Sequence, residues 1–111
     1  MELISLAQLG DEHLAKAGDS PQGRSAHTVV GGRTRTLRHL LLALKAGEEL
    51  ADHEAPGEAT VLVLRGRVTL GTGTQEVTVA TLELLEIPDE RHNLRALEDS
   101  VVVLTVAKAL D

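Results

Sequence analysis

Phenylalanine, tryptophan, tyrosine and cysteine are all absent from the 111 residues of this chain. Without aromatic rings the protein has no cage for a quaternary amine and no platform on which the bases of a single-stranded nucleic acid could stack. Acid–base chemistry by tyrosine is excluded as well. Without cysteine there is no disulfide, no thiolate nucleophile and no sulfur-ligated zinc, so the sequence places no constraint on the redox compartment.

Positive charge and long apolar runs are also scarce. Seventeen acidic residues oppose eleven basic ones, which gives a formal net charge of -6. This balance is typical of a cytoplasmic protein and argues against binding to nucleic acid or to an anionic membrane. Residues 40–44 form the longest uninterrupted apolar run, which is too short to cross a bilayer, and the first residues do not resemble a signal peptide. We therefore expect a cytoplasmic location with no nucleic-acid or membrane partner.

The length suits one domain with a short N-terminal extension. Ser5 followed by Gln8 is a capping-box pattern, and the leucines that follow form a loose apolar stripe, which together predict a short helix. A polar linker follows it at residues 19–25. We assign residues 1–25 to this helix and linker, which must dock on the main domain or on a partner chain, and residues 26–111 to the main domain.

The main domain has the pattern of an all-β fold. Short runs of β-favouring residues recur between turns rich in glycine and proline, at the spacing typical of a sandwich or barrel. The predicted strands are 26–30, 36–44, 59–64, 67–71, 75–79, 82–87, 93–96 and 100–106.

Two of these strands predict a second covered face. Residues 60–64 and 101–104 are apolar at consecutive positions, so both faces of each strand should be buried. One face can line the interior of the domain. A second sheet, the N-terminal helix or another subunit must cover the other, and we favour a homodimer whose seam the N-terminal segment helps to cover.

Histidine is the residue type on which chemistry would depend. We expect His13 on the surface of the helix and His27 at the start of a strand, with no special role for either. His39, His53 and His92 lie on or beside predicted strands, and a sheet can bring distant strands together. Neutral imidazole is the commonest nitrogen ligand of divalent metals and also a general acid–base near neutral pH.

The segments around two of these histidines resemble the motifs of the cupin family of small β-barrels. The segment from Gly47 to His53 matches the opening glycine, spacing and first histidine of the first cupin motif, and Gly66 stands where its closing glycine belongs. In the second motif, Pro88 is followed shortly by His92. The resemblance covers residues 37–106 and implies a double-stranded β-helix, or jelly-roll barrel, with a short N-terminal helix.

The chain departs from the cupin pattern at metal-ligand positions. Ala55 stands in place of the second histidine and Ala59 in place of the glutamate, with Glu58 beside it. The resemblance therefore implies that two of the four usual ligands survive, His53 and His92, and that they lie at the mouth of the barrel. Two imidazoles alone hold a metal weakly.

His39 is the candidate for a third ligand. Its position along the strand groups it with Leu37, Leu41 and Ala43, an apolar set that we expect to face inward. Three inward histidines would pair with one another, with water or with a metal, because a buried imidazole needs partners for its nitrogens. The alternative for His39 is a hydrogen-bonded core or interface residue.

Three functions follow from these patterns. The first is binding of a small molecule in an aliphatic pocket lined by His39, His53 and His92, without established catalysis. The second is a metal-dependent cupin enzyme of the dioxygenase, isomerase or decarboxylase type, with Fe, Mn, Ni or Zn held by the same three histidines. The third is a regulatory or interaction domain in which the histidines only pack. The depleted ligand set favours the first.

A small basic patch stands out in this acidic chain. It consists of Arg33, Arg35 and Arg38, just before the predicted core. Such a patch could receive the carboxylate of a ligand. It also suits a polar sheet edge that keeps strands of separate molecules apart.

Overall fold

The computed structural model describes residues 1–53 and 57–108, with the side chain of His53 left out. Residues 54–56, which include Ala55, and residues 109–111 lie outside the described part. The described elements are α1 (Leu6–Asp19), β1 (Arg24–Val30), β2 (Leu37–Leu44), β3 (Glu49–His53), β4 (Glu58–Arg65), β5 (Arg67–Gly71), β6 (Glu76–Ala80), β7 (Leu84–Glu86), β8 (His92–Ala96) and β9 (Ser100–Ala107). Within these ranges no helix has the length and apolar character needed to cross a membrane.

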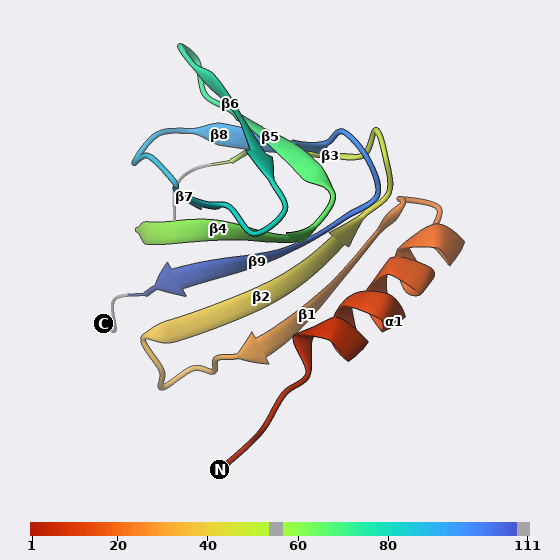
Figure 1. Ribbon diagram of the computed structural model, residues 1–111. Helices are drawn as coiled ribbons and strands as arrows, with labels where there is room; N and C mark the ends of the chain where they lie inside the picture. The colour runs from red at the N-terminus through yellow and green to blue at the C-terminus, as the bar shows by residue number, and fades with distance from the viewer. Residues whose placement is uncertain (54–56, 109–111) are drawn as a thin grey trace.

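The strands form two antiparallel sheets that pack face to face. The larger sheet has the order β1-β2-β9-β4-β7 and the smaller has the order β3-β8-β5-β6. Figure 1 shows the smaller sheet above the larger one, with α1 beside β1 and β2 on the side away from the smaller sheet. The predicted all-β fold class with a short N-terminal helix is confirmed.

The space between the sheets is filled mainly by aliphatic side chains. Alternate residues of β4 point into it, because successive side chains of a strand point to opposite faces. The buried members of this inter-sheet core are Leu42, Leu44, Ala59, Val61, Val63, Val68, Leu70, Val79, Ile87, Leu94, Ala96 and Val102. Removal of this apolar surface from water is the main force that holds the two sheets together.

The helix covers part of the opposite face of the larger sheet. Ala17 packs there with Leu41, Ala43 and Val101 in a second, smaller apolar cluster. Gly10 faces this cluster, and a Cβ at that position would lie 3.4 Å from a methyl group of Val101, which is an ordinary van der Waals distance. The predicted N-cap is confirmed, because the side chain of Ser5 accepts a hydrogen bond from the Gln8 amide.

Three expectations from the sequence are wrong. Strand β3 was not predicted, because its residues lack the β-branched and aromatic side chains that mark strands, and its pairing with β8 creates it. His13 is not on the helix surface but only 6% exposed beneath it. The set of His39, Leu41 and Ala43 faces α1 rather than the inter-sheet core, since Leu41 and Ala43 pack in the helix-side cluster.

One end of the barrel is held by a dense set of polar contacts; we call it the turn end (residues 44–48, 65–67 and 96–100). Asp99 binds Lys45 at 2.7 Å and accepts a hydrogen bond from the Ala46 amide at 2.9 Å. The hydroxyl of buried Ser100 lies within hydrogen-bond distance of the carbonyl oxygens of Arg67 and Glu98. These contacts tie the two sheets together at the end away from the predicted histidine site.

Candidate functional site

The other end of the barrel, which we call the mouth, is formed by residues 38–40, 57–59, 86–92 and 104–108. Two cavities open there. One, of about 530 Å3, lies between the start of β4 and the segment that follows β7, and Ala59 and Ile87 are among its lining residues. The other, of about 460 Å3, lies over β2 and β9 and includes Leu40 and Val106. They adjoin, because Val106 is the register partner of Ala59.

His92 is the most clearly placed imidazole of the mouth. It begins β8 and is 3% exposed, on the same face of the strand as core residues Leu94 and Ala96. Its Nδ1 lies 2.8 Å from the carbonyl oxygen of Glu90, which can only accept, so Nδ1 carries the proton. In the neutral ring Nε2 is therefore the acceptor nitrogen.

His53 stands beside His92 in the backbone register. The two are paired across β3 and β8, next to a register shift that follows Leu50. This pairing brings together the two positions that the cupin resemblance singled out. Only the backbone of His53 is described, and Ala55 lies outside the described residues.

His39 lies on the helix-facing side of the larger sheet, away from the core face on which His92 lies. Its Nδ1 is 2.9 Å from the hydroxyl of Thr105, its neighbour across β9. It is also one of the residues that border the 460 Å3 cavity. The structure thus places His39 at the rim of the mouth with a hydroxyl partner, as in the alternative that we considered for it.

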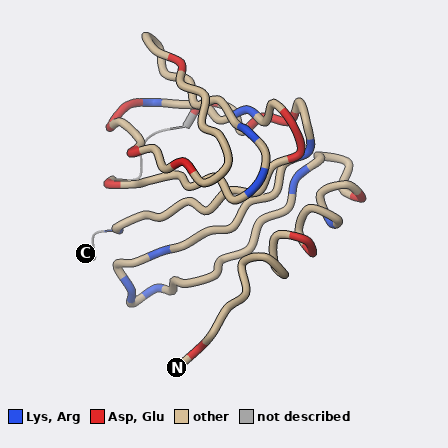
Figure 2. Tube along the Cα trace, in the orientation of Figure 1, with Lys and Arg blue, Asp and Glu red and all other residues tan. Residues whose placement is uncertain are grey.

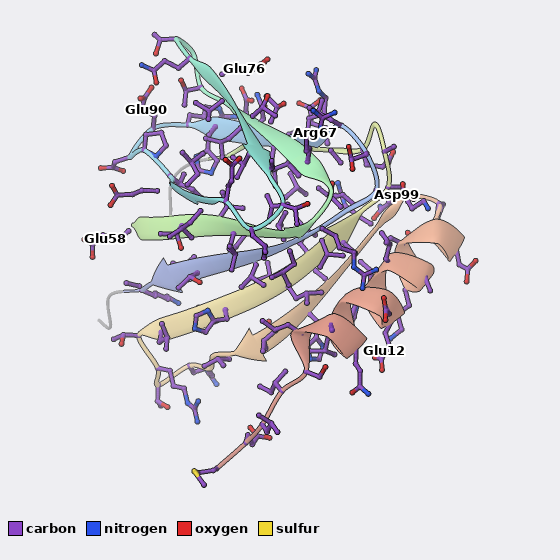
Figure 3. All side chains as sticks on the ribbon, in the orientation of Figure 1. Glu12, Glu58, Arg67, Glu76, Glu90 and Asp99 are labelled. Carbon is purple, nitrogen blue, oxygen red and sulfur yellow. The ribbon has the colours of Figure 1, made fainter. Side chains whose placement is uncertain are left out.

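Charge is divided across the mouth. Glu58, Glu86 and Asp89 border the 530 Å3 cavity, whereas Arg38 and Lys108 border the 460 Å3 cavity. Figure 2 shows the blue residues of the β1–β2 hairpin on the side of the mouth opposite the red residues near β4 and β7. In Figure 3, Glu58 and Glu90 lie at this end of the sheets, and Arg67 and Asp99 lie toward the other.

A metal centre of three or four protein ligands does not fit the residues that are described. Ala59, at the position where the cupin resemblance expects a glutamate, is 6% exposed and packs in the aliphatic core. Among the described side chains, which do not include that of His53, no three His, Cys, Asp or Glu residues gather in a group that could hold a metal ion. Stable zinc sites and most catalytic metal sites need at least three protein ligands.

Several residues of the mouth escaped the sequence analysis as site residues. Leu40, Leu104 and Val106 read as ordinary strand residues, and Lys108 carried no signal at all. Their alternation along two neighbouring strands could have placed the three apolar side chains on one face. It could not have shown that the smaller sheet leaves this part of the face uncovered.

Comparisons with known proteins identify the fold. No family model matches the sequence, and no curated protein matches it. Among solved structures, a conserved protein of unknown function from Streptococcus pyogenes is 25% identical over 83% of this chain and 80% of its own length, with a TM-score of 0.72. An RmlC-like cupin protein from Desulfovibrio desulfuricans is 22% identical over 96% of both chains, with a TM-score of 0.72.

The structure of a salicylate 1,2-dioxygenase from Pseudaminobacter salicylatoxidans is also similar to that of this chain. It is 18% identical over 90% of this chain but only 33% of its own length, with a TM-score of 0.74. At these levels of identity the similarity concerns the fold. The chain therefore has the jelly-roll barrel of the cupins, and the resemblance predicted from its two motifs is confirmed.

Proposed function

We propose that this cupin-type protein binds a small molecule in the mouth of its barrel, with imidazole at the polar end of the site. The observation that carries the proposal is the pair of cavities at the mouth, the end of the barrel at which buried His92 begins β8. A buried imidazole whose Nδ1 proton is held by a main-chain carbonyl has a fixed tautomer and orientation.

The size and lining of the mouth support this function. The two adjoining cavities, of about 460 and 530 Å3, fall within the range of small-molecule sites, roughly 300–1,000 Å3. Ala59 lines one cavity and its register partner Val106 lines the other, so the lining where the two cavities come together is aliphatic. Apolar contact would therefore supply affinity, and the few polar groups around it would supply orientation.

The test compares two imidazoles in one protein. A mixture of small organic acids, alcohols and amides is screened by ligand-observed NMR against the wild type, His92→Asn and His27→Asn. His27 is exposed on β1, so its substitution is the matched control. We expect hits to be lost or weakened in the His92 variant alone. Equal binding by all three proteins, or no hit at all, would contradict the proposal.

A metal-dependent enzyme is the second candidate, because His53 and His92 are backbone partners. Protein purified without chelators or a histidine tag should then contain stoichiometric Fe, Mn, Ni or Zn that His92→Ala removes. Metal-free protein whose melting temperature does not change when these ions are added would exclude this candidate. The missing carboxylate at Ala59 leads us to expect the metal-free result.

We also propose that the protein acts as a homodimer, in the cytoplasm as its acidic composition suggests. Leu62 and Leu84 are register partners on the outer face of the larger sheet, and Leu84 is 64% exposed. The helix packs on β1, β2 and β9 and leaves this part of the face without a layer among the described elements. In light scattering at micromolar concentration, Leu84→Glu should give a monomer, whereas Leu97→Glu at the turn end should not. A monomeric wild type would contradict the dimer.

A further inference from the structure

We propose that the cavity over β2 and β9 is a site for an aliphatic monocarboxylate, with its carboxylate on Arg38 and its hydrocarbon tail along Leu40, Leu104 and Val106. This inference rests on the proposed function, because it names the chemical class of ligand for the mouth. It assigns the anionic end of that ligand to the larger sheet, across the barrel from His92.

The floor of the cavity is built by strand register. Leu40 is paired with Leu104, and Arg38 with Val106, so these side chains share one face of the sheet. It is the inner face, since Leu104 and Val106 pack against the inter-sheet core. All three apolar residues are half-buried, so the floor joins the core on one side and opens to solvent on the other.

The charge of Arg38 is not compensated by the residues around it. Its Nη2 makes one long hydrogen bond, 3.5 Å, to the carbonyl oxygen of Gly32. Its Nε is buried and finds no acceptor among the described residues. The four ion pairs found in residues 1–53 and 57–108 involve other cations. A partly desolvated guanidinium whose Nε lacks an acceptor favours the arrival of an anion.

A second cation lies at the rim of the same cavity. The amide of Lys108 donates a 2.6 Å hydrogen bond to the carbonyl oxygen of Thr36, which fixes the end of β9 beside the start of β2. The described lining of the cavity contains Arg38 and Lys108 and no acidic residue. In a chain of net charge -6, a cavity with this lining attracts anions and repels cations.

The chemistry of the lining favours a carboxylate with an apolar tail over a phosphate. A planar guanidinium matches the two oxygens of a carboxylate, and one flexible lysine adds charge without a second fixed donor. Phosphate sites commonly use the amides of a helix N-terminus, and α1 lies on the other face of this sheet. An aliphatic floor without aromatic rings suits a flexible hydrocarbon chain.

The experiment is a titration of the full-length 15N-labelled protein with hexanoate, followed by the shifts of its backbone amides. Hexanoate should shift amides of β2 and β9 around Arg38 and Val106 in a saturable way. Hexanamide and inorganic phosphate should bind at least about tenfold more weakly, because hexanamide lacks the carboxylate and phosphate lacks the hydrocarbon tail. Lengthening butanoate to hexanoate should tighten binding roughly fourfold for each methylene that is buried.

Substitutions then test the anchor itself. Arg38→Gln should weaken hexanoate at least about tenfold, and Arg38→Lys, which keeps the charge, should weaken it less. Arg35→Gln removes the same charge from the exposed hairpin and should leave binding unchanged. Retained dispersion of the amide spectrum shows that each variant is folded.

Two results would overturn the inference and leave the proposed function standing. One is equal binding of hexanoate by the Arg38→Gln and Arg35→Gln variants. The other is hexanoate shifts confined to β8 around His92. If neither hexanoate nor any compound of the mixed screen shifts an amide of the mouth, the proposed function fails together with the inference.

Discussion

The two ends of the barrel differ in how their polar side chains are paired. At the turn end, Asp99 and Ser100 find partners on neighbouring loops, and Arg67 pairs with Glu98 at 3.2 Å. At the mouth, the Nε of Arg38 finds no acceptor among the described residues, and two cavities remain. The polar groups named at the turn end are thus paired within the protein, whereas the mouth leaves one buried guanidinium nitrogen without an acceptor among the described residues. This difference agrees with a turn end that stabilises the fold and with our proposal that the ligand binds at the mouth.

The largest effect should come from a single methyl group at the turn end. Gly66 has φ +80°, and a Cβ there would collide with the carbonyl oxygen of Asp99 and the hydroxyl of Ser100. We expect Gly66→Ala to lower the free energy of unfolding by about 3 kcal/mol, measured by urea denaturation. Gly73 is the control, since nothing lies within 4 Å of a Cβ placed there. Equal losses in both variants would show that the turn end is not specially constrained.

A smaller loss of stability is expected when the charge of Asp99 is removed from the turn end. The hydrogen bond from Lys45, and next the one from the Ala46 amide, hold the pKa of Asp99 below its usual value of 3.8. The side chain is 45% exposed, so Asp99→Asn should cost only about 0.5–1 kcal/mol at neutral pH. Because the folded pKa is lowered, this contribution is complete above pH 3.8 and is lost as the pH falls through the folded pKa. A difference from wild type that persists at lower pH would contradict this assignment.

A substitution at the mouth should have the opposite effect on the free energy of unfolding. Arg38→Leu removes a buried donor that lacks an acceptor and extends the aliphatic floor. We expect the ligand-free protein to be unchanged or more stable by up to about 1 kcal/mol in urea denaturation. Arg35→Leu, in the exposed hairpin, controls for the loss of one positive charge. A clear loss of stability in the Arg38 variant alone would mean that this residue supports the fold.

The smallest effect concerns the histidine beneath the helix. His13 lies 2.7 Å from the hydroxyl of Ser25, and its ring centroid is 5.2 Å from that of His27. Burial first, then the charges of Lys16 and His27, lower the pKa of His13 below 6.5. The neutral ring is therefore favoured in the folded state, and stability should be full above pH 6.5 and decrease as the pH falls from there through the folded pKa.

The measurement is the slope of unfolding free energy against pH in that window, for the wild type and His13→Asn. The variant should lose less stability on acidification than the wild type. If the slopes are equal, His13 does not titrate differently in the two states. In that case the helix interface is not the pH-sensitive part of the fold.

Much of the fold was predictable because it follows from local pattern. Consecutive apolar residues in β4 and β9 and the glycine at position 66 all produced correct strands or turns. Strand β3 was missed because its acidic sequence has no strand propensity of its own. Pairing with β8 creates it, and pairing between distant segments is not written in either segment alone.

The site was less predictable because its character depends on neighbours from several strands. The sequence singled out His92, and the structure adds the carbonyl of Glu90 that fixes its tautomer. It singled out Arg38 only as part of a charged patch, and its missing acceptor is visible only in three dimensions. His13 was dismissed because a residue count along a helix does not say which face the sheet will cover.

The absence of Phe, Trp and Tyr makes this protein almost silent in near-ultraviolet absorption and in fluorescence. Any absorption or fluorescence at wavelengths longer than the peptide absorption would come from an added chromophore, either a coloured ligand or a single introduced indole. Leu104→Trp, for example, would place one emitter in the floor of the mouth with no background from the rest of the chain. The absence of rings, which removes several functions from the protein, thus makes its own binding site unusually easy to observe.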